Sequence, residues 1–176
     1  TRRSSDLAVE ALDSVEVEVV RTQLTQIERA YGPLGAFVHV HPRLDIDSTA
    51  GGPLDDRARA LVKAVFVTAT EIGPALNRSA AAGRSVFATV TRLDGEMGLG
   101  GGSAFDPVGS GLSGLVKTLR LEWPAVFCRA VDLDPAYDVE TAVARVEAEL
   151  HDPNRRLVDV GWRAGRRVML DALEEA

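Results

Sequence analysis

The first part of the chain carries a helical and then an extended pattern of apolar residues. The apolar residues at helical spacing are Val17, Val20, Leu24, Ile27 and Tyr31. This spacing predicts an amphipathic helix, and Asp13 with Glu16 predicts a capping box in front of it. Gly32 and Pro33 end the helix, and LGAFVHV (34–40) is then typical of a buried strand.

The middle of the chain continues this alternation. A second helix is predicted over about 53–76, ended by glycine and asparagine, and SVFATV (85–90) is a second β-rich run. The segment 91–104 is predicted to be a loop. Asp106 as N-cap and Pro107 in the first turn then begin a third helix. The apolar stripe of that helix consists of Leu112, Leu115, Val116 and Leu119.

The last third of the chain adds a strand, a helix and a strand pair. VFCRAVDL (126–133) is a third apolar strand and ETAVARVEAEL (140–150) a further helix. RLVDV and RRVML flank GWRAG (161–165), which predicts a hairpin or strand pair. Strands alternating with helices predict an α/β domain with a mostly parallel sheet flanked by helices. Residues 1–176 are predicted to form this one domain.

Composition narrows the class of protein. Hydrophobic residues make up 45% of the 176 residues but aromatic residues only 5%, so the core is expected to consist mainly of Val, Leu and Ala. The net charge of −6, with dispersed basic residues, argues against nucleic acid as a partner. No apolar run approaches the roughly 18–20 residues that cross a bilayer, and no secretory signal opens the chain. The first residue is Thr rather than Met, which indicates a segment of something longer.

Cysteine and histidine offer little for catalysis or metal binding. Cys128 is the only cysteine, so an internal disulfide is impossible and a reducing, cytoplasmic location is expected. We interpret Cys128 as a small buried hydrophobe. His39 and His41 alternate on one strand and share a face. Because His151 is far away in the sequence and no cysteine pair is present, no metal site is expected.

A glycine run and several charged residues are candidate binding sites. GLGGGS (98–103) would let backbone amides approach a phosphate, but it lacks the Lys and Ser/Thr of a phosphate loop, which favours a connector. Arg163, Arg166 and Arg167 are interpreted as a solvated basic edge rather than an anion site. The carboxylates expected at helix starts, strand ends or solvated faces, with no acid–base pair among them, are Asp55, Asp56, Asp132, Asp134, Glu147 and Glu149.

The stretch GSGLSGLVKTLRLEWPAVFCRAVDLD (109–134) carries a resemblance to a known family. Its Gly-Leu-Val-Lys helix, Glu-Trp-Pro turn and strand ending in Asp-Leu-Asp resemble the ketoreductase region of type I polyketide synthases, which is of the short-chain dehydrogenase/reductase (SDR) type. FATVTRLDG (87–95) is similar to the preceding strand and loop, and VDVGWRAGRRVML (158–170) to the closing strand pair. The resemblance implies a truncated, Rossmann-like SDR fold.

The residues that would make such a helix catalytic are replaced. In active members of the family a Tyr gives the proton, a Ser holds the carbonyl oxygen and NADPH gives the hydride. We align Gly114 and Leu115 with the family's Gly-Leu pair. This alignment puts Phe105 at the Tyr position, Gly109 at the following Asn or Lys position, and Arg92 near the Ser position. The family's cofactor fingerprint is also missing, so no catalytic, cofactor-binding or metal-binding residue is expected in this segment.

The resemblance is closest to the non-catalytic structural subdomain of these ketoreductases. The leading hypothesis is therefore a scaffold that packs against the catalytic subdomain, with that subdomain and the neighbouring synthase domains as partners. NADPH would be bound by the catalytic subdomain and not by this chain. Two alternatives stay open: a fragment of an active NADPH-dependent β-ketoacyl reductase, and an independent SDR-like interaction module.

Overall fold

The computed structural model describes residues 8, 11–12, 14–42, 56–101 and 107–170. Within these ranges a five-stranded sheet has the strand order β1-β2-β3-β4-β5. The strands are β1 (Ala36–Val40), β2 (Val86–Thr91), β3 (Phe127–Leu133), β4 (Asp159–Arg163) and β5 (Arg166–Val168). The first four are parallel, and β5 pairs antiparallel with β4. The predicted α/β fold with a mostly parallel sheet is confirmed.

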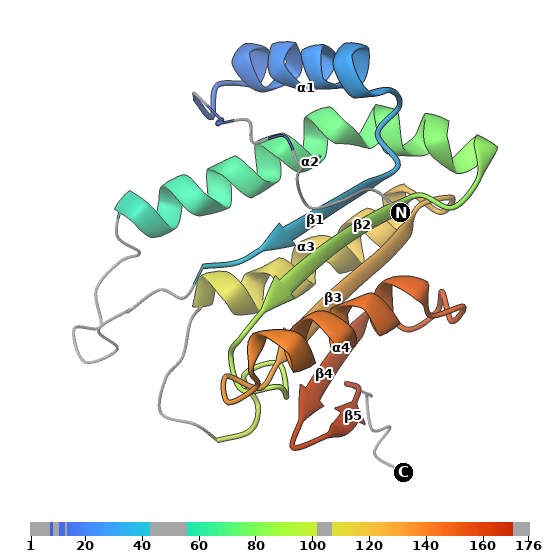
Figure 1. The fold of residues 1–176 in the computed structure, drawn as a ribbon. Helices are drawn as coiled ribbons and strands as arrows, with labels where there is room; N and C mark the ends of the chain where they lie inside the picture. Colours follow the sequence, from blue (N-terminus) through green and yellow to red (C-terminus); the bar gives the residue numbers. More distant parts are fainter. Residues whose placement is uncertain (1–7, 9–10, 13, 43–55, 102–106, 171–176) are drawn as a thin grey trace.

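Helices cover both faces of the sheet (Figure 1). The four helices are α1 (Val17–Tyr31), α2 (Asp56–Ala82), α3 (Pro107–Glu122) and α4 (Val139–His151). α2 and α3 lie on one face, α4 lies on the other, and α1 packs on α2 on the side away from α3. None of the helices in the described ranges is long and apolar enough to cross a membrane.

The two core layers follow from the alternation of side chains along β2 and β3. Phe87 and Cys128 point to the face covered by α2 and α3, where they pack among Ile72, Leu76 and Val116. On the opposite face a second cluster packs against α4; its buried members are Val90, Val131 and Leu133. Every residue of β2 and β3 is buried, as expected for central strands of a parallel sheet.

Three of the four residues in the predicted apolar stripe of α3 are buried. Leu112, Val116 and Leu119 are buried, whereas Leu115 is only half-buried. Pro107 is the first residue of the helix, as predicted, and its expected N-cap Asp106 lies outside the described residues. The stripe is wide enough to reach both the sheet and the neighbouring helix α2, so Leu115 lies at its edge.

The second helix does not end where its glycine and asparagine suggested. α2 continues through Gly73, Pro74 and Asn77 to Ala82. Gly73 is a contact position rather than a stop signal, because a Cβ there would lie 2.5 Å from the indole of Trp123. The Asn77 side chain donates a hydrogen bond to the Gly73 carbonyl (2.9 Å) instead of ending the helix.

The capping box predicted before α1 is wrong. Glu16 is itself the N-cap residue, and its side chain makes no capping hydrogen bond. Its carboxylate pairs with Lys63 Nζ of α2 at 2.7 Å, which joins the two helices. Asp13, the other half of the expected motif, lies outside the described residues.

The predicted hairpin at the end of the chain is confirmed. Ala164 and Gly165 form the turn between β4 and β5, and both have positive φ (48° and 77°). Positive φ at both turn residues matches the right-handed twist of the flanking strands, as in the primed two-residue turns of hairpins.

A buried ion-pair network fixes this hairpin to the rest of the sheet. Arg129 of β3 is 0% exposed and donates to Asp152 Oδ2 (3.1 Å). Glu149 of α4 is 1% exposed and accepts hydrogen bonds from Arg167 (2.8 and 2.7 Å) and from Trp162 Nε1 (2.9 Å). The solvated helix face expected for Glu149 is therefore wrong, because Arg167 and the Trp162 indole satisfy its carboxylate inside the protein, with Arg129 Nη1 3.7 Å away.

The burial along α3 gives a matched pair of stability variants. Leu119→Ala should lower the free energy of unfolding by about 2–5 kcal/mol, the usual cost of truncating a buried leucine. Leu115→Ala should cost clearly less, because this side chain is only partly buried in the folded state. Urea unfolding followed by circular dichroism measures both, and equal losses would contradict the assignment of Leu119 to the core.

Candidate functional site

The carboxyl ends of β2 and β3 are where a parallel α/β sheet normally binds its ligand. Arg92 directly follows β2, and Gly109 lies in the first turn of α3. Both positions are therefore near this end of the sheet, but Arg92 does not line the small cavity there that Gly109 lines. Phe105, the third position, lies outside the described residues.

Arg92 is directed away from the sheet end. Its guanidinium donates to the backbone carbonyls of Pro135 (3.0 Å) and Tyr137, in the connection between β3 and α4. Both of these hydrogen bonds come from Nη2, so one terminal nitrogen of Arg92 is engaged with the protein's own backbone. The side chain thus ties the loop after β2 to the loop after β3.

The glycine-containing loop after β2 folds around two carboxylates. Asp94 accepts backbone hydrogen bonds from Glu96 and Gly98 on one oxygen (2.8 Å each) and from Gly100 on the other (2.7 Å). A Cβ at Gly100 would meet the side-chain ends of Arg163, Glu96 and Asp94, so these side chains would have to shift to accept a larger residue. The amides that might have held a phosphate are occupied by an internal anion, which supports the connector interpretation over the described part of 98–103.

Asp132 is the second carboxylate inside this loop. It is 0% exposed and accepts hydrogen bonds from Thr91 Oγ1 (2.8 Å), Leu93 N (2.8 Å) and Met97 N (2.9 Å). Asp94 N adds a longer contact (3.3 Å). Met97 has φ of 60°, a strained value for a residue with a side chain, and its amide hydrogen bond to Asp132 helps to hold it there.

Burial and hydrogen bonding shift the two carboxyl groups in opposite directions. Desolvation by burial raises the pKa of Asp132 above its ordinary value, although its hydrogen-bond donors oppose this shift. Burial also acts on Asp94, but the backbone amides of Gly98, Glu96 and Gly100 and a side-chain hydrogen bond with Asp132 hold its pKa below the ordinary value. Asp132 thus does more than end a strand, because its buried carboxyl group organises the loop after β2.

A small cavity of about 220 Å³ lies between this loop, the ends of β2 and β3 and the first half of α3. Gly109 lines it, together with hydroxyl groups such as that of Ser113. Ser113 Oγ donates to Asp159 Oδ1 (2.6 Å), and Lys117 Nζ pairs with Asp159 Oδ2 (2.5 Å). The cavity is smaller than the roughly 300–1,000 Å³ of ligand pockets, and the Asp159 carboxylate already engages the hydroxyl and the ammonium group.

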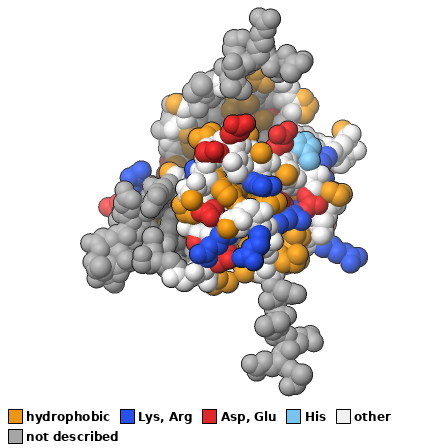
Figure 2. All heavy atoms as spheres, turned by 60° about the horizontal axis from the view of Figure 1, so that its bottom comes forward, with side chains coloured by type: hydrophobic (Ala, Val, Ile, Leu, Met, Phe, Trp, Pro, Cys, Tyr) orange, Lys and Arg blue, Asp and Glu red, His pale blue; other side chains and the backbone are white. Residues whose placement is uncertain are grey.

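Two of the three arginines expected to form a solvated edge at the end of the chain also pair with carboxylates. Arg163 pairs with Glu96 of the loop after β2, and Arg167 pairs with Glu149 and Asp152. Arg166 is exposed. On the face turned forward in Figure 2, acidic and basic side chains are interspersed rather than gathered by sign.

The other carboxylates considered in the sequence are mostly where capping and solvation predicted. Asp134 accepts a hydrogen bond from Ala136 N (2.9 Å) in the turn after β3. Asp56 lies in the first turn of α2, and Glu147 is exposed on α4. Asp55 lies outside the described residues. Sequence reasoning missed Asp94 and Glu96, although an aspartate that precedes glycine in a loop after a strand is a recognised turn-forming signal.

His39 and His41 lie close together and Cys128 is buried, as the sequence predicts. His39 Nε2 lies 3.5 Å from His41 Nδ1 on one face of β1. Burial, with the nearby His41, lowers the pKa of His39 to about 4. Burial raises the pKa of the Cys128 thiol to about 11, so this cysteine is a poor nucleophile. In the part of the chain that the structure describes, no three metal-ligating side chains are grouped to hold an ion.

Solved structures with a similar fold are dehydrogenases and reductases. A short chain dehydrogenase from Mycobacterium avium is 12% identical over 96% of this chain and 65% of its own, with a TM-score of 0.69. An alcohol dehydrogenase from Thermococcus sibiricus, complexed with 5-hydroxy-NADP, is 16% identical over 92% of this chain and 76% of its own, with a TM-score of 0.55.

A third similar structure is a multidomain one. The adenylation, ketoreductase and pseudo Asub structure of a keto acid-selecting NRPS module is 18% identical over 86% of this chain but only 12% of that chain, with a TM-score of 0.55. No protein-family model and no curated protein matches the sequence. At these identities the likeness establishes the fold: this chain has an SDR-like, Rossmann-like α/β architecture.

The carboxyl pair predicts a particular dependence of stability on pH. Because the pKa of Asp132 is raised in the folded state, the folded protein binds a proton that the unfolded chain, with a pKa of about 3.9, releases. The unfolding free energy of the wild type relative to Asp132→Asn should therefore rise as pH falls from about 8 to about 4.5. Asp94, with its lowered pKa, titrates below this window.

Urea unfolding of both chains across this pH series tests the prediction. The variant carries a neutral amide of the same shape, so its own stability lacks this one titration. A wild-type advantage that shrinks on acidification would mean that Asp132 is ionised with a lowered pKa.

Proposed function

We propose that this chain is the non-catalytic structural subdomain of a polyketide synthase ketoreductase. In this role it packs against the NADPH-dependent catalytic subdomain and stabilises it, within the cytoplasm. The polyketide synthase resemblance of 109–134 supports this context, and the structural likeness to a module that contains a ketoreductase agrees with it. The catalytic subdomain would supply all of the reductase chemistry.

One observation carries the proposal: the loop after β2 is closed on the protein's own carboxylates. The amides of Leu93, Met97, Gly98 and Gly100 all donate to Asp94 or Asp132. A substrate carbonyl or cofactor phosphate at this end of the sheet would have to displace those bonds, each to an anion or a buried carboxyl group. The bonds to the Asp94 carboxylate are charge-assisted, and such bonds are among the stronger ones in proteins.

The residues at the positions of the family's catalytic side chains also support a non-catalytic role. Arg92 donates to backbone carbonyls, and Gly109 offers no side chain to the 220 Å³ cavity that it lines. Phe105, read from the sequence, has no hydroxyl group to give a proton. A proton donor, a carbonyl-binding hydroxyl and a cofactor contact would each have to come from elsewhere.

The rival function is a fragment of a working reductase with an unusual catalytic centre. A similar structure is an NADPH-bound short chain oxidoreductase from Pseudomonas aeruginosa described as having an atypical catalytic center, 17% identical over 80% of this chain with a TM-score of 0.56. Such a centre in this chain would require a cofactor site formed with another part of the parent polypeptide. An SDR-like interaction module without any reductase neighbour is the third possibility.

Restoring the family's side chains should not restore activity. We expect the triple variant Arg92→Ser, Phe105→Tyr, Gly109→Asn to oxidise NADPH with trans-1-decalone no faster than buffer. The physical reason is that hydride transfer needs a cofactor held in attack geometry, and positioning accounts for much of the rate enhancement. The wild type should also give no saturable change in NADPH fluorescence.

The control for both assays is an active polyketide synthase ketoreductase measured under the same conditions. Circular dichroism of the triple variant must first establish that it is folded. Micromolar NADPH binding by the wild type, or turnover by the triple variant above the blank, would contradict the structural-subdomain proposal and favour the silenced or fragmentary reductase.

A further inference from the structure

Arginine side chains gather at the amino ends of β2 and β3, at the opposite end of the sheet from the loop that contains Asp94. Arg84 lies two residues before β2, and its guanidinium stacks on the ring of Phe127, the first residue of β3, at 3.9 Å. Its Nη2 atom donates to the carbonyls of Leu150 (2.8 Å) and Asp152 (2.9 Å), where α4 ends. The guanidinium is thereby held in place by a ring and two carbonyl groups.

Arg155 reaches the same region from the segment between α4 and β4. Its Nη2 atom donates to the carbonyls of Pro124 (3.2 Å) and Ala125 (2.6 Å), in the turn that leads from α3 into β3. Its own carbonyl oxygen accepts a hydrogen bond from Arg120 Nε (3.2 Å) of α3. Ala125 lies two residues before the ring that carries Arg84, so both guanidiniums are anchored around the start of β3.

The two anchored guanidiniums have uncharged partners. Among the described residues Arg84 and Arg155 pair with no carboxylate, and each uses only Nη2 for its hydrogen bonds. The Nε and Nη1 donors of both side chains therefore have no protein acceptor in this part of the chain. Asp152 has a carboxylate nearby, but it already pairs with Arg129 and Arg167.

Positive charge is in excess where these side chains meet. Partial burial and then the charge of Arg155 lower the pKa of the Arg84 guanidinium, and Asp152 raises this pKa by less. The carboxyl ends of α3 and α4 contribute about half a negative charge each, which is less than the two full charges of the guanidiniums. This local excess contrasts with the net charge of −6 of the whole chain.

We propose that Arg84 and Arg155 form a binding site for a phosphate group, whose oxygens accept hydrogen bonds from their unused Nε and Nη1 donors. A guanidinium presents its donors in a planar fork that matches the oxygens of phosphate. Two guanidiniums complement a phosphate monoester, which carries a charge of about −1.5 to −2 at pH 7. A carboxylate would neutralise only one of them.

Capping of carbonyl groups explains only part of this arrangement. A single Nη2 atom of each side chain makes the hydrogen bonds to the ends of the α3 and α4 segments, and an uncharged donor could make similar bonds. Holding two like charges near each other is unfavourable, and a bound anion reduces this repulsion. Phosphate binding here is independent of the scaffold role and of the expected absence of micromolar NADPH binding.

Nuclear magnetic resonance of the isotope-labelled chain tests the site. The arginine Nε–H signals are followed while sodium phosphate, phenyl phosphate or sodium acetate is added at constant ionic strength. The signals of Arg84 and Arg155 should shift saturably with phenyl phosphate, with a dissociation constant of about 1 mM or less. The signal of the exposed Arg166 should not shift. Acetate, with a single charge, should bind at least about tenfold more weakly.

Replacing one arginine by glutamine provides the affinity test. Arg155→Gln keeps an amide donor but removes the charge and the fork, so phosphate affinity should fall by about tenfold or more while the fold is kept. Arg166→Gln is the matched control, because it removes the same charge from an exposed arginine of β5, at the other end of the sheet. Circular dichroism checks that both variants are folded, and the wild-type titration tests the site even where a variant is not.

The outcomes decide between a built site and general screening of charge. Equal shifts at Arg166 and Arg84, equal affinity for acetate, or unchanged affinity in folded Arg155→Gln would each overturn the proposal. Saturable shifts with phenyl phosphate alone would support a phosphate ester of a larger molecule as the ligand. Equal shifts with both phosphates would support free phosphate as a ligand of the same site.

Discussion

Asp132 is fully buried at the carboxyl end of β3, and a carboxyl group at that depth is stable only while its oxygens have donors. The donors come from Thr91 and from the backbone of the loop that follows β2. The loop must therefore wrap over the end of the sheet, including the strained φ of Met97. Asp94, which lies in this loop, likewise accepts hydrogen bonds from the backbone amides of Gly98 and Gly100. The surface at which this fold class normally binds ligands is thereby closed by internal hydrogen bonds.

The closed loop also depends on close backbone approaches. A Cβ at Gly161 of β4 would lie 2.1 Å from the Gly95 carbonyl oxygen, and a Cβ at Gly95 would lie 2.3 Å from the Trp162 carbonyl oxygen. The loop after β2 is thus pressed against β4, and the Arg163–Glu96 pair lies beside it. Beyond that point, Arg167, Glu149 and Arg129 link the hairpin to α4 and β3. The hairpin is consequently joined to α4, β3 and the loop after β2 by ion pairs.

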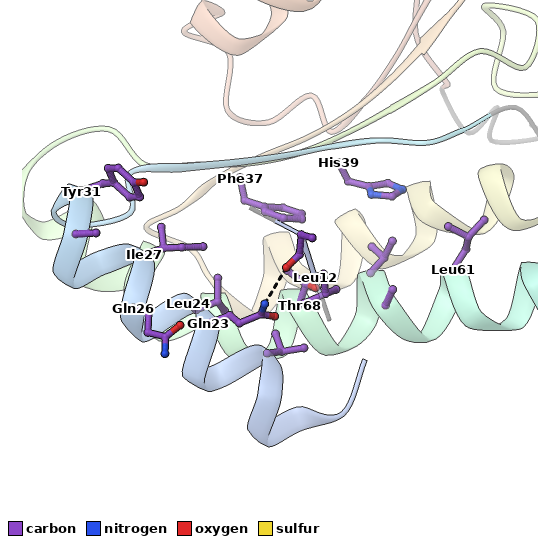
Figure 3. Close-up of a pocket in the computed structure, with 15 residues that line it drawn as sticks. Leu12, Gln23, Leu24, Gln26, Ile27, Tyr31, Phe37, His39, Leu61 and Thr68 are labelled. Carbon is purple, nitrogen blue, oxygen red and sulfur yellow. Dashed lines mark hydrogen bonds between the residues drawn. The ribbon is translucent and has the colours of Figure 1, made fainter. Parts of the chain in front are cut away.

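The β1 edge of the sheet, in the part of the chain that the structure describes, is not covered by a comparable set of hydrogen bonds. β1 ends in an exposed Val40, and a neutral apolar hollow lies between β1, α1 and α2 (Figure 3). The carboxyl ends of β2 and β3 are thus closed by internal hydrogen bonds, whereas the surface beside β1 is apolar and hollowed. The proposed scaffold role rests on this difference between the two parts of the sheet.

The sequence by itself determined the alternation of strands and helices, the final hairpin, the burial of Cys128 and the resemblance of 109–134, because each depends on spacing within a short segment. Only the tertiary structure decided that α2 passes through Gly73 and Pro74, since the glycine is fitted to Trp123, fifty residues away in the chain. The same holds for Asp132 and Glu149, which a local pattern assigns to strand ends and solvated faces. Their donors lie 13–41 residues away in the sequence, and a carboxylate's burial depends on such distant partners, which periodicity does not encode.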